Sequence, residues 1–373
     1  MNPDGSGLHP FLPGWRPSSG LCCGQWTPDG RIFEFLLYDP PSTSRDPNMP
    51  LAAQIWALGE RRRLFWRAPA EPVQLTSGPT QWNRPIPSKD GKKIFATGFT
   101  PNEELVRMDT MSGQLRPYLG GISAEGVSFS SEGRFIAYVT YPEGVLWRAN
   151  RDGSSPTQLT DPPLSPFLPH WSPDGAQILF SAADAAGYMK GYIISSQGGP
   201  PQPILPEGQE AQADPNWSPD GRKVVFDTRM IADAKALDLR ILDLASHQVT
   251  TVPGSAGMYS PRWSPDGRFL VALSISPFGL TLFDFETGRW SVLQKGGFDW
   301  PAWSRDGRYI YFLNAVDDKG VFRIRSSGGK PERVVDLEGF RLGGWMALDP
   351  EDQPMLDRDV GGVDIYALTL EEK

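Results

Sequence analysis

Cysteine is the scarcest reactive residue in this sequence. Only two cysteines occur among 373 residues, and they are neighbours, Cys22 and Cys23. A disulfide framework between distant loops is therefore excluded, because two adjacent residues cannot connect separate loops. Adjacent side chains of a strand also point to opposite faces, which suits them poorly to chelating one metal ion. We expect two small residues packed in a strand, with a redox or metal role as the alternative.

Histidine and the common catalytic motifs are lacking as well. The three histidines, His9, His170 and His247, do not show the spacing of metal ligands. The sequence contains neither the G-x-S-x-G motif of serine hydrolases nor a Walker A phosphate-binding loop. We accordingly expect no bound metal, no cofactor and no catalytic residue.

The sequence also lacks an excess of positive charge and a long apolar run. The 36 basic and 44 acidic residues give a net charge of -8, which repels nucleic-acid phosphates, so nucleic-acid binding is not expected. The most apolar stretch, residues 269–283, is too short to span a bilayer and contains Pro277. The first 25 residues lack the pattern of a signal peptide. We expect no membrane segment, and these residues do not indicate in which compartment the protein works.

Glycine, proline and aromatic residues, by contrast, are plentiful. The 40 glycines and 37 prolines indicate many turns, whereas 13 tryptophans and 19 phenylalanines supply the apolar volume of a folded core. Long helical periodicity is absent. This combination favours a turn-rich, all-β fold.

One motif recurs along the whole chain, in its clearest copies as W-S-P-D-G followed by an alternating apolar strand. Successive copies are 40 to 61 residues apart, and their tryptophan positions are Trp26, Pro87, Phe129, Trp171, Trp217, Trp263, Trp303 and Leu348. In Ser-Pro-Asp-Gly, proline sets the backbone of a tight turn, aspartate bonds to nearby amides, and glycine takes a positive φ. The turn therefore joins two strands. The tryptophan is predicted to fill the layer between neighbouring sheets.

Two further strand-like segments follow each motif, such as "GYIISS" and "PQPILP" after Trp171. Four strands in a unit of this length are typical of a β-propeller blade, so we predict an eight-bladed propeller in a single domain over residues 1–373. Residues 1–15 contain a segment like a fourth strand, "GLHPFLP", while the last unit lacks its fourth strand. We expect this N-terminal strand to complete the C-terminal blade and close the ring.

The motif P-x-W-S-P-D-G-x-x-I-x-F, followed by a Q-L-T strand, resembles the TolB-type, WD-repeat-like propeller repeat over essentially the whole chain. More loosely, "LPGWRPSSGLCCGQWTPDG" and "PVQLTSGP" are similar to the extracytoplasmic propeller of bacterial proteins that carry an N-terminal winged-helix domain. The resemblance implies a bacterial, periplasmic or otherwise extracytoplasmic chain that binds a protein or peptide partner. It also implies the sensor or interaction part of a larger protein. We expect a monomer.

Residues just before the tryptophan position should line the mouth of the central channel, because equivalent strands of a propeller surround one axis. These residues differ in charge and size from copy to copy, whereas the turn residues are uniform. Aromatic residues and arginine contribute most to binding interfaces. The candidate partner-binding residues are Arg84, Glu125, His170, Asp214, Tyr259, Arg262, Asp299 and Trp300. The alternative is that a wet channel mouth tolerates any residue.

The sequence therefore favours a non-catalytic binding scaffold. An enzyme that uses the same channel mouth, a lyase or hydrolase acting on a glycan or peptide, is the alternative. It would need a carboxylate pair within catalytic reach, such as Glu125 and Asp299.

Overall fold

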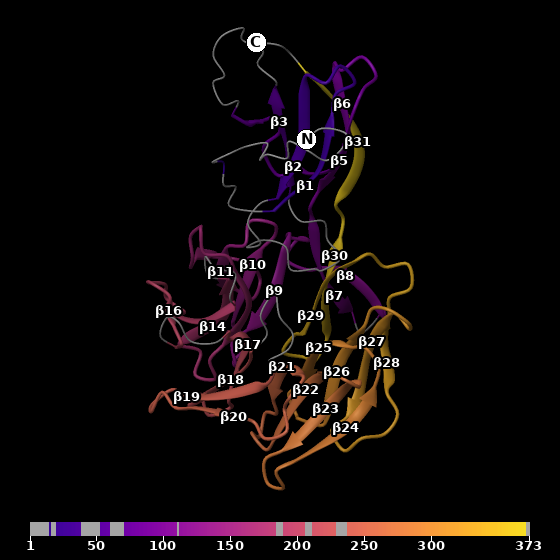
Figure 1. Cartoon of the computed structure of the whole chain (residues 1–373). Coiled ribbons are helices and arrows are strands. Elements are labelled where there is room, and N and C mark those ends of the chain that lie inside the picture. Colours follow the sequence, from indigo (N-terminus) through magenta and orange to yellow (C-terminus); the bar gives the residue numbers. More distant parts are fainter. Residues whose placement is uncertain are drawn as a thin grey trace. The chain divides into compact units, whose positions relative to one another are not determined.

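The computed structural model describes residues 15, 20–38, 53–59, 71–109, 112–183, 189–205, 211–228 and 237–370. The regular elements in these ranges are all β-strands, and the prediction of an all-β protein is confirmed. They form seven four-stranded sheets and one three-stranded sheet, one sheet for each motif copy (Figure 1). No helix in the described ranges is long and apolar enough to cross a membrane. Residue contacts divide the chain into two compact units.

The first unit consists of Met1–Pro101 and Gly361–Lys373. Its four-stranded sheet has the order β1 (Leu21–Trp26), β2 (Ile32–Tyr38), β3 (Ala53–Gly59) and β4 (Val73–Gln74). Its three-stranded sheet has the order β31 (Gly362–Thr369), β6 (Lys93–Thr100) and β5 (Gln81–Pro87). Buried residues of both sheets, among them Leu36, Ile55 and Ile94, form one hydrophobic cluster.

The second unit, Asn102–Val360, contains six four-stranded sheets. The first three are β9 (Ala124–Phe129), β10 (Phe135–Thr140), β11 (Leu146–Asn150) and β12 (Thr157–Gln158); β13 (Pro166–Trp171), β14 (Gln177–Ala183), β15 (Met189–Ser195) and β16 (Gln202–Pro203); and β17 (Ala213–Trp217), β18 (Lys223–Asp227), β19 (Leu239–Asp243) and β20 (Val249–Thr251). The other three are β21 (Met258–Trp263), β22 (Phe269–Ile275), β23 (Phe278–Asp284) and β24 (Arg289–Lys295); β25 (Asp299–Trp303), β26 (Tyr309–Asn314), β27 (Gly320–Arg325) and β28 (Glu332–Asp336); and a closing sheet of β29 (Leu342–Leu348), β30 (Pro354–Asp359), β7 (Glu103–Asp109) and β8 (Gln114–Pro117).

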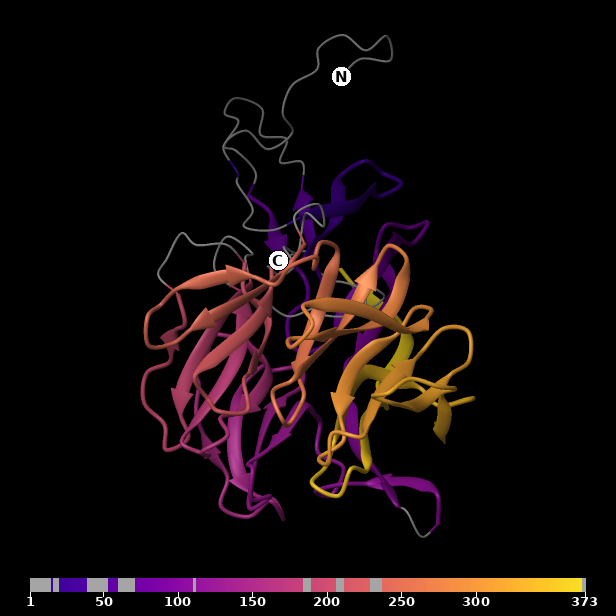
Figure 2. The ribbon, with the colours of Figure 1, turned by 90° about the horizontal axis from the view of Figure 1, so that it is seen from below.

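These six sheets form a closed ring. Their first strands contact one another in the order β9, β13, β17, β21, β25 and β29, and β29 contacts β9 (Figure 2). A separate cluster of buried hydrophobic residues fills each of the six layers between neighbouring sheets. The second unit is therefore a six-bladed β-propeller with its core between the blades.

The tryptophans of the motif connect neighbouring sheets of the ring. Trp171 and Trp217 are buried, as predicted for residues that fill the layer between sheets. Three indole N–H groups donate to the carbonyl just before the tryptophan position of the preceding sheet: Trp171 to Ser128 at 3.1 Å, Trp217 to His170 at 3.1 Å and Trp303 to Arg262 at 3.0 Å. Trp26 of the first unit differs, because it is 44% exposed and packs on Phe33 of its own sheet.

The Ser-Pro-Asp-Gly turns form as their chemistry predicts. After Trp217, the Ser218 hydroxyl donates to Asp220 Oδ1 at 2.6 Å, and the same oxygen accepts the Arg222 N–H at 3.0 Å. Gly221 follows with a φ of 70°. Equivalent serine–aspartate hydrogen bonds occur in the turns beginning at residues 88, 172, 264 and 304. Hydrogen bonds within the turn use these carboxylates, which supports a structural role for them.

The arrangement of the sheets corrects the prediction of one ring with eight blades. The last repeat was expected to supply three strands of one blade, but β29 and β30 pair with β7, whereas β31 pairs with β6. The reason lies in β7, whose Leu105 and Val106 are completely buried and belong to the clusters on either side of the closing sheet. The chain thus forms a ring of six blades and a second compact unit, where a single domain was expected.

The expected closing strand falls on residues 1–15, of which the structure describes only Trp15. Its pairing therefore lies outside the described residues and stays a prediction. In the closing sheet of the ring, the third and fourth places are taken by β7 and β8.

The expectation for the cysteines was wrong. Cys22 and Cys23 do not pack as two separate small residues; they form a disulfide with each other in β1.

Candidate binding site in the propeller channel

A β-bulge recurs in the first strand of the blades, three residues before the tryptophan position. The backbone there is left-handed, with φ of 50° at Leu168, 46° at Asp214, 54° at Ser260 and 54° at Trp300. The strand pairing shifts register at the same place, for example between Ala213 and Asn216. Glycine adopts this conformation readily, whereas a larger side chain there costs about 1 kcal/mol or more.

The repeat therefore requires a left-handed backbone three residues before the tryptophan position. The residue type at this position varies from copy to copy, so the sequence did not indicate this requirement. Gly126 of β9 meets the requirement, with a φ of 59°. Leu168, Asp214 and Trp300 are held in the same conformation despite their side chains. Residues strained in this way often cluster at functional sites, so the bulge positions are candidates for function.

Three of these bulge residues, Gly126, Leu168 and Trp300, line a cavity of about 350 Å³ at the centre of the ring. All six first strands contribute to its wall, through Ser128, His170, Asn216, Arg262, Trp300 and Trp345 among others. The cavity is therefore the channel of the propeller, and it is lined by both aromatic and polar side chains.

A buried ion pair lies beside this cavity. Arg262 Nη2 is 2.9 Å from Asp214 Oδ1, and both residues are at least nine-tenths buried. The Ser260 hydroxyl donates to Asp214 Oδ2 at 2.5 Å, while the Ser260 backbone N–H donates to Asp227 Oδ2 at 3.1 Å. Burial acts to raise the pKa of Asp214, but Arg262 and the other partners outweigh it and hold that pKa below its usual value.

His170 presents an unsatisfied nitrogen next to this pair. Burial lowers the pKa of His170 to about 3, Arg262 lowers it further, and Asp214 acts in the opposite direction. The imidazole is therefore neutral at physiological pH. Its Nε2 is buried and has no hydrogen-bond partner among the described residues. A bound group could supply that partner.

The site is chemically suited to polar groups of low net charge. The charges of Arg262 and Asp214 balance each other, and His170 is neutral. One further Arg262 hydrogen bond goes to the carbonyl of Pro261 at 2.8 Å, and a guanidinium has five N–H donors in all. Together with Trp300, the arrangement offers aromatic surface and hydrogen bonds of the kind that a peptide backbone can use.

A group of acidic residues lies near the start of β7, in the closing sheet. Glu103 and Asp357 are buried, and burial raises the pKa of both; Asp357 and then Glu125 raise that of Glu103 further. Asp357 Oδ1 accepts the N–H groups of Gly344 at 3.1 Å and Trp345 at 2.8 Å. The described residues contain no group of three or more histidine, cysteine or acidic residues placed to hold a metal ion.

The eight predicted site residues lie in several different parts of the structure. His170, Arg262 and Trp300 line the cavity, and Asp214 is paired with Arg262. Glu125 belongs to the acidic group instead.

The remaining three predicted residues lie elsewhere. Tyr259 is half-buried and packs on the cluster between the β21 and β25 sheets, and Asp299 is exposed at the start of β25. Arg84 is an exposed residue of β5 in the first unit. It therefore does not belong to the six first strands around the channel, whereas the prediction placed it at the channel mouth of a ring of eight blades.

Sequence reasoning missed two residues that hold the ion pair in place, Ser260 and Asp227. Asp227 is completely buried at the end of β18, directly after the apolar run "VVF". A carboxylate directly after a strongly apolar strand was the available signal. For Ser260 the available signal was its offset, because it lies three residues before Trp263, as the candidates Asp214 and Trp300 lie before their own tryptophans.

A protein-family description, the TolB beta propeller domain, matches residues 128–346. This is more than half of the chain. The chain belongs to the TolB β-propeller family. The prediction of a TolB-type propeller is therefore confirmed, and the matched residues lie within the six-bladed ring.

A curated relative matches this TolB-family chain over part of its length. An uncharacterized protein of Agrobacterium fabrum is 32% identical over 111 residues, which are 29% of this chain and 37% of that protein. The matched segment thus spans little more than a third of that relative's length.

Two solved structures share the fold. One from Agrobacterium tumefaciens, provisionally assigned as TolB, has a TM-score of 0.57 at 20% identity, covering 69% of this chain and 98% of that one. An oligogalacturonate lyase in complex with manganese has a TM-score of 0.52 at 17% identity, covering 96% and 99%. Identities this low show the fold alone.

Proposed function

We propose that this TolB-family chain is a non-catalytic scaffold that binds a protein or peptide segment at the channel of its six-bladed ring. The observation that carries the proposal is the left-handed backbone at Leu168 and Trp300, which both line one cavity. Glycine would be the more stable choice at each of these positions. Leu168 packs in a core cluster, but Trp300 is only partly buried, and contact with a ligand would explain why its side chain is kept at a cost in stability.

The chemistry of the cavity wall supports a peptide. Trp300 offers a large apolar surface, Arg262 carries spare donors, and His170 Nε2 lacks a partner among the described residues. Aromatic residues and arginine are also the side chains that dominate protein interfaces. The balanced ion pair gives no strong preference for an anion or a cation.

The enzyme alternative receives less support. It required a carboxylate pair within catalytic reach, such as Glu125 and Asp299, and neither of these two residues belongs to the described wall of the cavity. Similarity to a lyase structure at 17% identity concerns the fold and not the reaction.

We further propose that the chain works outside the cytoplasm as a monomer and as the interaction part of a larger bacterial protein. Support comes from the repeat's resemblance to propellers of that kind. Fractionation of the native cells with an antibody against this chain tests the location.

The binding proposal is tested by panning a phage-displayed random-peptide library on the purified chain and measuring the Kd of selected peptides by fluorescence anisotropy. We expect Trp300→Gly and Arg262→Lys each to weaken the selected peptides by about tenfold or more, as for interface residues of this type. Phe278→Ala is the matched control, because Phe278 is 58% exposed on β23 and does not line the cavity. Failure to select any peptide, or equal affinity in all variants, contradicts the proposal.

A further inference from the structure

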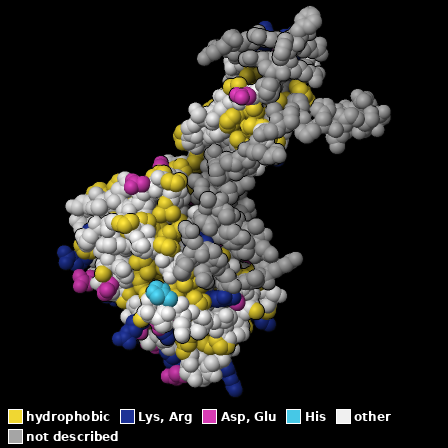
Figure 3. Space-filling view, turned by 60° about the vertical axis from the view of Figure 1, so that its left-hand side comes forward, with side chains coloured by type: hydrophobic (Ala, Val, Ile, Leu, Met, Phe, Trp, Pro, Cys, Tyr) yellow, Lys and Arg dark blue, Asp and Glu magenta, His cyan; other side chains and the backbone are white. Residues whose placement is uncertain are grey.

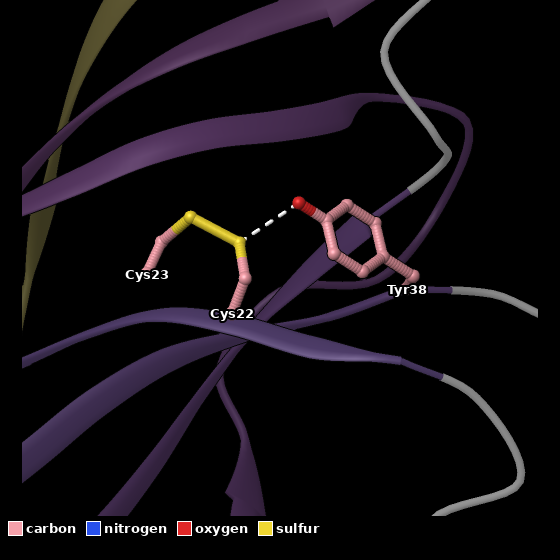
Figure 4. Close-up of a disulfide and its surroundings, with 3 residues drawn as sticks. All are labelled: Cys22, Cys23 and Tyr38. Carbon is pink, nitrogen blue, oxygen red and sulfur yellow. Dashed lines mark hydrogen bonds between the residues drawn. A yellow bond between two sulfur atoms is a disulfide. The ribbon is translucent and has the colours of Figure 1, made fainter.

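The disulfide between Cys22 and Cys23 is chemically unsymmetrical. Cys23 is exposed and occupies the left-handed bulge of β1, with a φ of 61°. Cys22 is half-buried, and its Sγ lies 2.8 Å from the hydroxyl of Tyr38 (Figure 4). The two sulfur atoms therefore differ both in access and in hydrogen bonding.

The bond has no evident structural purpose. A disulfide stabilises a fold mainly by closing a loop in the unfolded chain, and the effect grows with loop length. Here the two residues are adjacent, so no residue lies between them. The hydrogen-bonded ladder between β1 and β2 already holds this part of the chain.

The surroundings of the disulfide offer a surface on which another protein could dock. In the first unit hydrophobic side chains reach the surface (Figure 3). On β1 itself, Leu21 is 45% exposed and Trp26 is 44% exposed, one on either side of the cysteines.

We propose that Cys22–Cys23 is a thiol–disulfide exchange site whose substrate is a dithiol. A thiolate of the dithiol attacks the exposed Cys23 Sγ, the bond between Cys22 and Cys23 breaks, and its electron pair goes to Cys22 Sγ. The Tyr38 hydroxyl donates a hydrogen bond to the resulting Cys22 thiolate and so favours it as the leaving group.

The second thiolate of the substrate completes the reaction. It attacks the substrate sulfur of the mixed disulfide, and Cys23 leaves as a thiolate. The substrate is oxidised to a disulfide with loss of two electrons, while Cys22 and Cys23 are reduced and take up the two protons that the dithiol gives up. Tyr38 acts as a positioning residue through Cys22.

The assignment is tested on the full chain with two thiols, dithiothreitol and glutathione. Intact mass after iodoacetamide alkylation should show two modified cysteines after dithiothreitol, and unchanged thermal unfolding should confirm that the fold persists. Glutathione should be trapped on Cys23, as shown by peptide mapping. A folded chain that resists dithiothreitol, or glutathione found mainly on Cys22, overturns the proposal.

Tyr38→Phe is the second variant, because it keeps the ring that packs on the neighbouring cluster and removes only the hydroxyl. We expect reduction by dithiothreitol to be about tenfold slower at every pH, as for the loss of one hydrogen bond to a charged group, because the hydroxyl acts on the leaving thiolate and not on the attacking one. The preference of glutathione for Cys23 should also decrease. An unchanged rate and an unchanged attachment site would show that Tyr38 has no part in the exchange and contradict this assignment.

Discussion

Asp214 of β17 and Arg262 of β21 join neighbouring blades through a buried ion pair of 2.9 Å. The pair is held by Ser260, which donates its hydroxyl to Asp214 and its N–H to Asp227. The same arginine lines the channel. One interaction therefore links the stability of the ring to the site at its centre.

Asp214→Asn should destabilise the ring by roughly 3 to 5 kcal/mol, because it leaves Arg262 buried without its counter-charge. Urea unfolding measures the change. The double variant Asp214→Asn, Arg262→Met should recover part of the loss, since no unpaired charge remains. A single variant as stable as the wild type would show that water or another group already neutralises Arg262.

The Trp300→Gly and Trp300→Ala variants should differ in stability, with the glycine variant the more stable. Both remove the indole, but the φ of 54° at Trp300 suits glycine and strains alanine. We expect the glycine variant to be the more stable by about 1 kcal/mol in urea unfolding, the reverse of an ordinary strand position. Equal stabilities, or a more stable alanine variant, would mean that strain at the bulge is negligible.

Local features of the repeat could be predicted from the sequence, because they depend on few neighbouring residues. The turn after Trp217 follows from serine, aspartate and glycine within one short segment. The filling of the layers by Trp171 and Trp217 follows from the size and period of the motif.

The closing sheet could not be predicted in this way. Both β7 and β31 are short strands that contain apolar residues, and their local patterns do not decide which of them pairs with β30. The choice depends on packing far along the chain, where Leu105 and Val106 of β7 fill two clusters at once. The site was predicted only in part for a similar reason. The bulge at Leu168 and Asp214 leaves no glycine in the sequence to mark it.

Gly221→Val tests whether the Ser-Pro-Asp-Gly turn is purely structural. Gly221 has a φ of 70°, a conformation that a β-branched side chain adopts with strain. We expect a loss of about 1 to 3 kcal/mol in urea unfolding and no change in the Kd of channel-binding peptides. Binding lost at unchanged stability would instead make the turn part of the site.

Glu103 and Asp357 should make the propeller less stable as the pH rises. Burial raises the pKa of Glu103 from 4.5 to about 10, with help from Asp357, and raises that of Asp357 from 3.8 to about 7. The folded chain therefore keeps protons that the unfolded chain releases. These groups stabilise the folded chain fully below their pKa values in the unfolded chain. Their contribution decreases as the pH rises to their pKa values in the folded chain.

Glu103→Gln isolates this effect, because glutamine is neutral at every pH and nearly the same size. The wild type should melt at a lower temperature at about pH 8 than at about pH 5, and the variant should lose much of that difference. The reason is that one proton bound only in the folded state changes the free energy of unfolding by up to about 1.4 kcal/mol per pH unit. Glu338→Gln, at an exposed residue, should keep the wild-type dependence. If Glu103→Gln also keeps it, the carboxyl group is already ionised in the folded chain, and a cation or water must accompany it in the closing sheet.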